Sequence, residues 1–285
     1  DSGRGRAVSF SFVGLSFAEG LFPILMVILL ATIDWRWAWG AAATFMLFLG
    51  LPALMWSLKG HGDRHSMYLQ ALEGEDKPTK FEREHSGQYH WSRKQVVKDW
   101  RFWTLAPGMM AYPALVTAIF FYQDFIARDK GWSLTAFAGS FLIFAIVKVF
   151  SGLMSGTLVD RFSGRQLVIF INLPLMAAFA ILMSTDSPFA LTAMMVLIGI
   201  GIGILVPTGS ALTAELYGTR HMGSIKALTS FLMVLSTAMT PILFGALIDA
   251  GFSSERLFLI MLTYTAFGVA LKLVTLPHLH PRPPR

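Results

Sequence analysis

Eight long apolar runs limit what this chain can fold into more than any other feature of its sequence. The runs lie at 7–32, 36–58, 102–122, 134–157, 167–184, 188–214, 224–248 and 257–276. The hydrocarbon core of a bilayer requires about 20 apolar residues per helix, and each run is close to or above that length. Only 14% of the 285 residues are charged, whereas a soluble domain carries about 25%. The sequence therefore predicts an all-α membrane protein that crosses the bilayer eight times.

Lysine and arginine residues predict how these spans are oriented. One set of alternate loops collects most of them, including the 59–101 stretch, whereas Arg36, Arg128, Lys130 and Arg256 lie on the other side. Because cytoplasmic loops are enriched in Lys and Arg, both termini of this chain are predicted to be cytoplasmic. The net charge of +6 is then explained by membrane insertion and does not indicate a nucleic-acid partner.

One polar stretch, 59–98, separates the second run from the third. Ser92 and Gln95 near its end form the pattern of a capping box, which predicts a short interfacial helix ahead of the third run. The predicted organisation is a two-helix segment at 1–58, a central cytoplasmic loop at 59–98, a six-helix bundle at 99–277 and a cytoplasmic tail at 278–285.

An internal similarity links the first and seventh runs. Gly5 to Pro23 spans the same number of residues as Gly223 to Pro241, and both prolines are followed by Ile-Leu. Transporters are often built from internal repeats, and this one pairs the first two runs with the last two. The third to sixth runs then lack counterparts, which predicts four further helices ahead of residue 1.

The segment GTLVDRFSGR at 156–165 resembles the loop signature of the major facilitator superfamily. Ser163 is one extra residue before the second glycine, and the matching residues are Gly156, Leu158, Asp160, Arg161, Gly164 and Arg165. The resemblance implies a fold of twelve helices in two six-helix halves, of which this chain would supply eight, helices 5 to 12. The segment FIARDKGWS at 125–133 is similar to the matching part of monocarboxylate and oxalate/formate porters.

The resemblance also implies a role for the signature loop. In this family the loop latches the cytoplasmic ends of the two halves together, so Asp160 is expected to face the start of the first run, near Arg4 and Arg6. Gly156 is expected to let its helix approach a neighbour closely. An ordinary turn that carries positive charge on the cytoplasmic side is the alternative interpretation.

Two charged residues lie near the middle of apolar runs, Glu19 in the first and Lys148 in the fourth. A charge at mid-bilayer costs about 3 kcal/mol or more unless it is paired or hydrated. The family fold places these two helices at the interface of the halves, so one hypothesis is a Glu19–Lys148 contact with Glu19 as a proton carrier. The alternative is a neutral, hydrogen-bonded Glu19 and a Lys148 that extends toward the cytoplasmic interface.

Other polar residues in the predicted helices are candidates for the lining of a substrate cavity. They are Tyr112, Gln123, Asp124, Asn172, Thr208 and Thr237. Most hydroxyl groups in membrane helices bond to backbone carbonyls or to a neighbouring helix, so a structural role is the alternative for each of them. The GIGIGI segment at 199–204 is similar to a dinucleotide-binding loop, but it lies inside an apolar run, which favours close helix packing instead.

These patterns argue against a membrane-embedded enzyme and against a channel. All seven histidines lie in loops or in the tail, and the chain has no cysteine, so neither a metal site nor a catalytic centre is expected at membrane depth. His61 and His65 have the spacing of a metal-binding pair but have no clear third ligand. A channel would require polar stripes along several helices, which these runs lack.

The predicted function is therefore secondary active transport. A small solute, such as an organic anion, would cross the cell membrane by alternating access coupled to protons. A drug or metabolite efflux antiporter is the alternative. We expect a monomer that needs no cofactor and no metal, whose partners are the substrate, protons and the lipid bilayer.

Overall fold

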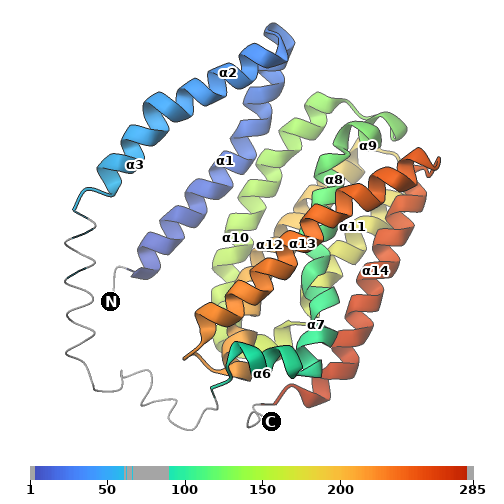
Figure 1. The fold of residues 1–285 in the computed structure, drawn as a ribbon. Helices are drawn as coiled ribbons and strands as arrows, with labels where there is room; N and C mark the ends of the chain where they lie inside the picture. Colours follow the sequence, from blue (N-terminus) through green and yellow to red (C-terminus); the bar gives the residue numbers. More distant parts are fainter. Residues whose placement is uncertain (1–3, 61, 63–65, 67–89, 281–285) are drawn as a thin grey trace. The chain divides into compact units, whose positions relative to one another are not determined.

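The computed structural model describes residues 4–60, 62, 66 and 90–280. All regular structure in these residues is helical, as the apolar runs predict (Figure 1). Contacts divide the chain into two units: Leu25–Gln88 forms one, and Asp1–Ile24 together with Tyr89–Arg285 forms the other. Each unit is described by itself.

The smaller unit is a run of helical segments. It takes in the end of α1 (Arg4–Thr32), α2 (Trp35–Phe45), a π-helical turn (Met46–Gly50) and α3 (Leu51–Ser57). The turn into α2 is stabilised because Asp34 Oδ1 accepts a hydrogen bond of 2.9 Å from the N–H group of Arg36. The indole rings at the start of α2 are exposed, which is typical of tryptophan at a membrane–water interface.

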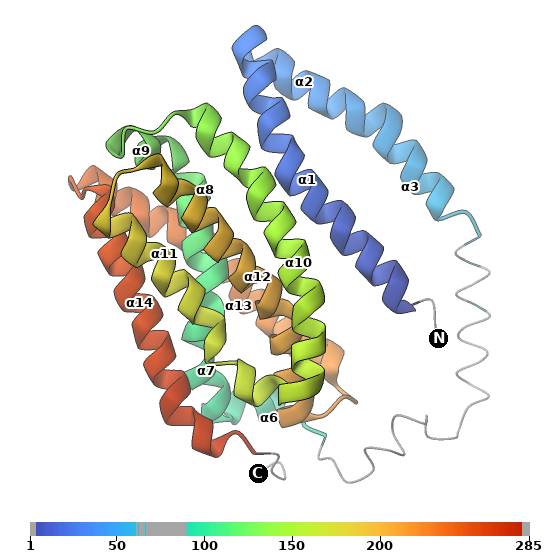
Figure 2. The same cartoon turned by 180° about the vertical axis from the view of Figure 1, so that it is seen from behind.

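The larger unit contains most of the helices. In chain order these are α6 (Arg93–Lys98), α7 (Trp100–Ala111), a π-helical turn (Tyr112–Val116), α8 (Thr117–Phe121), α9 (Gln123–Asp129), α10 (Leu134–Leu167), a 3-10 turn (Phe170–Asn172), α11 (Leu173–Ser184), α12 (Pro188–Tyr217), α13 (Met222–Asp249), α14 (Ser254–Thr275) and a 3-10 turn (Leu276–His278). Figures 1 and 2 show α7 and α10 to α14 side by side.

Packing in this bundle is organised around α12. It contacts α10 and α11 extensively, while α14 packs on α7 and α11, and α13 packs on α8 and the π-helical turn. The core is apolar and aromatic, with Phe137, Phe179 and Phe258 fully buried. Burial of this surface within the protein holds the bundle together, and α13 keeps most of its surface open in the described part of the chain.

The passage from the fourth to the fifth apolar run is kinked rather than straight. Ser163 has φ 65° and ψ 156°, a backbone region that residues other than glycine rarely adopt. The helical segments Arg161–Leu167 and Phe170–Ser184 are inclined at 75° to each other. The extra residue in the signature loop therefore kinks α10, and the 75° bend into the next span follows it, between Leu167 and Phe170.

Six helices in the described residues are long and apolar enough to cross a membrane, or up to seven if the bent pair is one span. Within α1, the stretch Ala18–Thr32 is apolar but shorter. The membrane-spanning, all-helical class is thus confirmed, whereas the count of eight spans out of twelve stays a prediction.

The helix predicted at the end of the polar stretch is α6. Its start has the capping box, in which the Gln95 side-chain oxygen accepts a hydrogen bond of 2.8 Å from the Ser92 N–H group. The candidate metal pair His61 and His65 lies outside the described residues.

Candidate functional site

A charged pair joins α1 to α10. Lys148 Nζ donates a hydrogen bond to Glu19 Oε2. Lys148 is 5% exposed, and its ammonium group lies 5.8 Å from the centre of the Phe144 ring. The Glu19 side chain is 36% exposed. The structure thus brings together the two intramembrane charges that the sequence singles out, and the carboxylate is the more accessible of the two.

Close helix packing surrounds this pair. A Cβ atom on Gly20 would lie 2.9 Å from Ala145 Cβ, so only glycine lets α1 approach α10 this closely. On α12, a Cβ on Gly203 would lie 2.7 Å from the carbonyl oxygen of Lys148, and one on Gly199 would meet α10 in the same way. The GIGIGI segment is therefore a packing surface, as its apolar surroundings predict.

The signature loop is organised by Glu215 of α12. The Glu215 carboxylate accepts hydrogen bonds from the backbone N–H groups of Gly164, at 2.7 Å, and Arg165, at 3.2 Å. Arg165 Nε lies 3.5 Å from the same carboxylate. A negative charge at the first N–H groups of a helical segment stabilises its start. A Cβ on Gly164 would lie 2.5 Å from Leu212 N, so this contact requires glycine.

Gly156 and Arg161, two further signature residues, have few neighbours in the described part of the chain. No atom in the described part of the chain lies within 4 Å of a Cβ built on Gly156. The close helix approach expected there is found at Gly164 instead. The Arg161 guanidinium lies 5.3 Å from the Phe162 ring centre. The side chains of Asp160, Arg4 and Arg6 are not among those described, so the latch between them stays a prediction.

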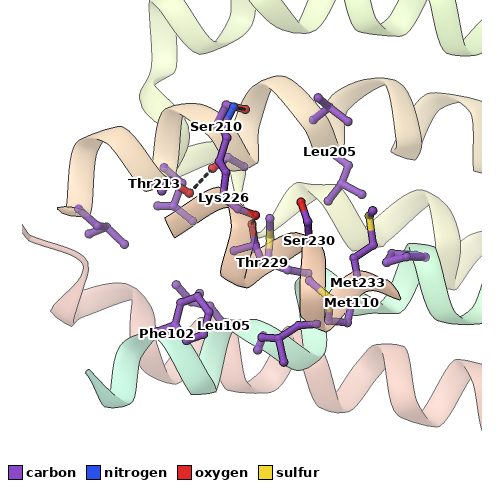
Figure 3. A pocket seen from close by; sticks show the side chains of 18 of the residues that line it. Phe102, Leu105, Met110, Leu205, Ser210, Thr213, Lys226, Thr229, Ser230 and Met233 are labelled. Carbon is purple, nitrogen blue, oxygen red and sulfur yellow. Dashed lines mark hydrogen bonds between the residues drawn. The ribbon is translucent and has the colours of Figure 1, made fainter. Parts of the chain in front are cut away.

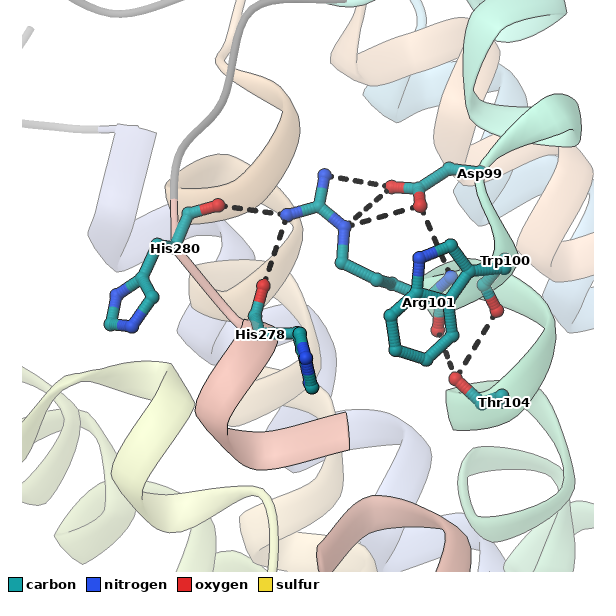
Figure 4. A network of polar contacts seen from close by, with 6 residues as sticks. All are labelled: Asp99, Trp100, Arg101, Thr104, His278 and His280. Atoms are coloured by element: carbon teal, nitrogen blue, oxygen red, sulfur yellow. Dashed lines mark hydrogen bonds and ion pairs between the residues drawn. The ribbon is translucent and has the colours of Figure 1, made fainter. Parts of the chain in front are cut away.

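A second polar network lies at the start of α7 (Figure 4). The Arg101 guanidinium forms an ion pair with Asp99, whose Oδ2 lies 2.8 Å from Nη2. Arg101 Nη1 donates hydrogen bonds to the carbonyl oxygens of His278, at 3.2 Å, and His280, at 2.8 Å. Arg101 is only 2% exposed. Arg101 therefore fastens the segment after α14 to α7. Arg165 of α10 binds the same segment by donating to the carbonyl oxygen of Leu279.

A third network is built on a lysine that is fully buried within the bundle. Lys272 of α14 is 0% exposed, and its Nζ donates to the carbonyl oxygen of Val168, at 3.0 Å, and to Asn172 Oδ1. Asn172 Nδ2 in turn donates to the carbonyl oxygen of Gly108 at 3.0 Å. The ammonium group therefore satisfies a carbonyl at the bend before α11, where regular helical bonding is interrupted.

The opposite end of the bundle is joined by Lys130. Its Nζ lies 2.5 Å from Asp186 Oδ1 and 3.9 Å from Glu255 Oε1, although its side chain is only 2% exposed. Asp129 Oδ2 accepts a hydrogen bond of 2.9 Å from the N–H group of Ser254. These bonds tie together the loops before α10, α12 and α14.

A cavity of about 270 Å³ opens between α7, α12 and α13 (Figure 3). Its walls are apolar over most of their area and include hydroxyl groups and three thioethers. Lys226 is the charged residue in its lining, and its Nζ donates to Ser210 Oγ at 3.1 Å. Lining residues include Phe102, Leu105, Met109, Met110, Leu205, Ser210, Thr213, Lys226, Thr229, Ser230 and Met233.

None of the six residues suggested for a substrate cavity lines this one. The Tyr112 hydroxyl is buried and donates to the carbonyl oxygen of Ile171 at 3.0 Å. Asn172 is used by Lys272, and Thr208 is fully buried next to Pro207.

The remaining three candidates lie toward the surface of the described chain. Asp124 pairs with Arg128 at 2.9 Å. Gln123 begins α9, and Thr237 bonds to the carbonyl oxygen of Val234 one turn earlier. The alternative of a structural role therefore describes the contacts of Tyr112, Asn172 and Thr237.

Sequence reasoning overlooked Lys272, Arg101 and Lys226. Each lies near the end of an apolar run, where a basic residue is ordinarily explained by the cytoplasmic interface. Two glycines, Gly108 and Gly268, could have indicated that Lys272 lies at a close helix crossing. A Cβ on Gly268 would lie 2.8 Å from Gly108 Cα, which shows that α7 and α14 cross closely beside Lys272.

The sequence profile described as Major Facilitator Superfamily matches residues 116–285, which is more than half of the chain. The matched part runs from the π-helical turn after α7 through α14 and contains the signature loop and Lys148. A comparison with curated proteins finds no match.

Proposed function

The chain belongs to the major facilitator superfamily, and from this premise we propose that it moves a small organic anion across the cell membrane by proton-coupled alternating access. The family supports membrane transport in general; the substrate class, the coupling ion and the mechanism are our proposal. The observation that carries it is the contact between Glu19 and Lys148, because opposite charges at membrane depth are costly and typically mark an ion or substrate pathway.

The pair suggests a coupling step. When Glu19 is ionised, Lys148 is neutralised by it. Protonation of a Glu19 carboxylate oxygen removes that negative charge and leaves the Lys148 ammonium able to donate to a substrate carboxylate instead. The proton and the anion would then be bound together. The net charge of the site would stay at zero, whereas the anion alone would make it negative.

Accessibility supports this division of roles. Glu19 is the more exposed partner, whereas Lys148 lies against Phe144 and the tightly packed α12. In this fold the two halves rock against each other around a central site. We propose that α1 belongs to one half and α10 to the other, so that the pair would be made and broken during the cycle, with the termini of this chain in the cytoplasm.

Reconstitution of the complete protein in proteoliposomes tests the proposal. Uptake of radiolabelled lactate, oxalate and benzoate would be measured with and without an inward proton gradient, and protein-free vesicles would correct for diffusion of the neutral acids. We expect the gradient to drive accumulation of at least one of them. Glu19→Gln should abolish that accumulation while exchange without a gradient continues.

Two results would contradict the proposal. Gradient-driven accumulation by Glu19→Gln at the wild-type level would remove the proton role. Extrusion of lipophilic cations, with no response to any of the three anions, would favour the efflux antiporter instead.

A further inference from the structure

We propose that α6 and the first turn of α7 form a binding surface for an anionic phospholipid, in which three basic side chains hold the headgroup phosphate and neighbouring apolar side chains rest among the acyl chains. Such a lipid site is independent of which solute the protein moves and of how transport is coupled. Its residues lie outside the part of the chain that the family profile matches, 116–285. They are Arg93, Lys94, Val97, Lys98, Trp100 and Trp103.

The helix α6 has two distinct faces. Val96 is 0% exposed and belongs to the core of the bundle, whereas Arg93, Lys94, Val97 and Lys98 are all exposed. At about 100° per residue, these four exposed positions cover about 140° of the helix circumference. The buried face packs against α7 and α13 (Figure 1), which leaves the basic face open to a partner.

The charge on this face is not offset by the protein. Arg93, Lys94 and Lys98 form no ion pair among the residues that the structure describes. Asp99 is the only acidic residue between 90 and 123, and its carboxylate is buried and paired with Arg101 (Figure 4). Three positive charges therefore lie together on one exposed face, and each of them adds to the attraction toward anionic lipids.

An apolar surface continues from the basic one. Val97, Trp100 and Trp103 are 41%, 47% and 46% exposed. Trp103 Nε1 donates a hydrogen bond of 2.7 Å to the carbonyl oxygen of Val97, so the indole N–H group is satisfied and the ring is held against the end of α6. A candidate membrane span begins at Trp100, which places these rings where tryptophan typically meets the headgroup region.

The two surfaces together favour a phospholipid over a free phosphate ion. A free ion would engage only the basic side chains, whereas a phospholipid would also cover the exposed valine and indole rings. Basic residues beside tryptophan are typical of helices that lie at the membrane interface. The competing explanation is membrane insertion alone, which depends on how many basic residues a loop carries. A headgroup site depends instead on their positions along α6.

Native mass spectrometry of the complete protein in detergent tests this assignment. Phosphatidylglycerol and phosphatidylcholine with the same acyl chains would be titrated separately, and the dissociation constant of the first bound lipid would be measured for each. Phosphatidylcholine carries the same phosphate, but its choline group cancels the charge. We expect phosphatidylglycerol to bind at least about tenfold more tightly. Excess inorganic phosphate should not displace it, because phosphate lacks the acyl chains.

Variants locate the site. A triple variant with Gln at Arg93, Lys94 and Lys98 should lose the preference for phosphatidylglycerol, whereas exchange of Lys for Arg and of Arg for Lys at the same positions should retain it. A matched control removes the same number of charges from exposed residues of α9, α10 and α14 and should also retain it. The control substitutions are Arg128→Gln, Arg161→Gln and Arg256→Gln.

A second measurement does not depend on the folding of the triple variant. A nitroxide label on Val97→Cys would report its surroundings by electron paramagnetic resonance in nanodiscs of either lipid. We expect the label to be shielded from a water-soluble nickel relaxation agent in phosphatidylglycerol and to be more accessible in phosphatidylcholine.

Three results would overturn the assignment: equal affinities of the wild-type protein for the two lipids, equal loss of affinity in the triple variant and its matched control, or equal nickel access in the two kinds of nanodisc. The second of these would show that only the number of charges matters. Displacement by inorganic phosphate would also count against a phospholipid and would indicate a site for the free ion instead.

Discussion

Two lysines in membrane-spanning helices, Lys148 and Lys272, are both buried, yet they are satisfied in different ways. Lys148 has a carboxylate partner on α1 whose side chain is 36% exposed. Among the described residues, the hydrogen-bond acceptors of Lys272 are a backbone carbonyl and an amide oxygen, both inside the bundle. The first contact joins two opposite charges on different helices, whereas the second depends on neutral acceptors within the bundle. The comparison indicates that burial of a charged side chain does not by itself identify a residue that takes part in a conformational change.

The largest effect should come from the helix crossing beside Lys272. Gly268→Leu would place a side chain against the backbone of Gly108, only 2.8 Å from its Cα, and such overpacking costs about 3 kcal/mol or more. We expect loss of most folded protein, measured as the monodisperse fraction in size-exclusion chromatography. Gly139→Leu is the control, since no described atom lies within 4 Å of its Cβ position. Equal yields of the two variants would show that this crossing is not tight.

The next largest effects should come from removing the side-chain partner of each lysine, Asn172 for Lys272 and Glu19 for Lys148. Asn172→Leu leaves a fully buried ammonium with one acceptor and should destabilise the protein by about 3 kcal/mol. Glu19→Leu should cost about 1 kcal/mol, because the Glu19 side chain is only partly buried and partly exposed ion pairs contribute less than buried ones. Melting temperatures of the two variants would rank them. A larger loss for Glu19→Leu would invert the comparison.

A double-mutant cycle on Glu19 and Lys148 would test whether their contact contributes to transport. Glu19→Gln and Lys148→Met should each impair transport by the complete protein, and the double variant should recover folding. The coupling free energy should be about 0.5–3 kcal/mol, while proton-driven accumulation stays absent. Losses that simply add in the double variant would mean that the observed contact contributes no coupling.

The smallest effect should come from an exposed pair. Asp124 and Arg128 form an ion pair at 2.9 Å, with side chains 50% and 80% exposed. Pairs of this kind contribute about 0.5 kcal/mol or less because water and salt screen them. Arg128→Gln should leave both the melting temperature and transport unchanged. A clear loss of transport would instead indicate that this end of α9 takes part in the cycle.

Much of the fold follows from the sequence because a bilayer imposes simple rules. Apolar length located six of the spans found in the described residues, and the signature at 156–165 indicated the family. Glu19 and Lys148 were identifiable because a charge amid apolar residues is rare. Tertiary proximity was harder to predict. Lys272 looked like an interfacial lysine, since the pattern around it does not reveal the bend at Val168 that it satisfies.

The cavity was hidden for a related reason. Its lining comes from three helices whose apolar residues point in many directions, so no periodic stripe marks it. The same limit explains the two signature glycines. Gly156 and Gly164 both belong to the motif, but only the structure reveals that Gly164 meets a neighbouring backbone, at Leu212 N.

The π-helical turn at Tyr112–Val116 has a consequence for how homologous sequences should be aligned. A turn of this kind behaves as a one-residue insertion in a regular helix, and one residue corresponds to about 100° of rotation. Positions from Thr117 onward therefore face a direction that a straight helix starting at Trp100 would assign to their neighbours. A relative that lacks one residue here would present a different set of side chains to α13, so a single gap in this helix would change the chemistry of the surface without changing its composition.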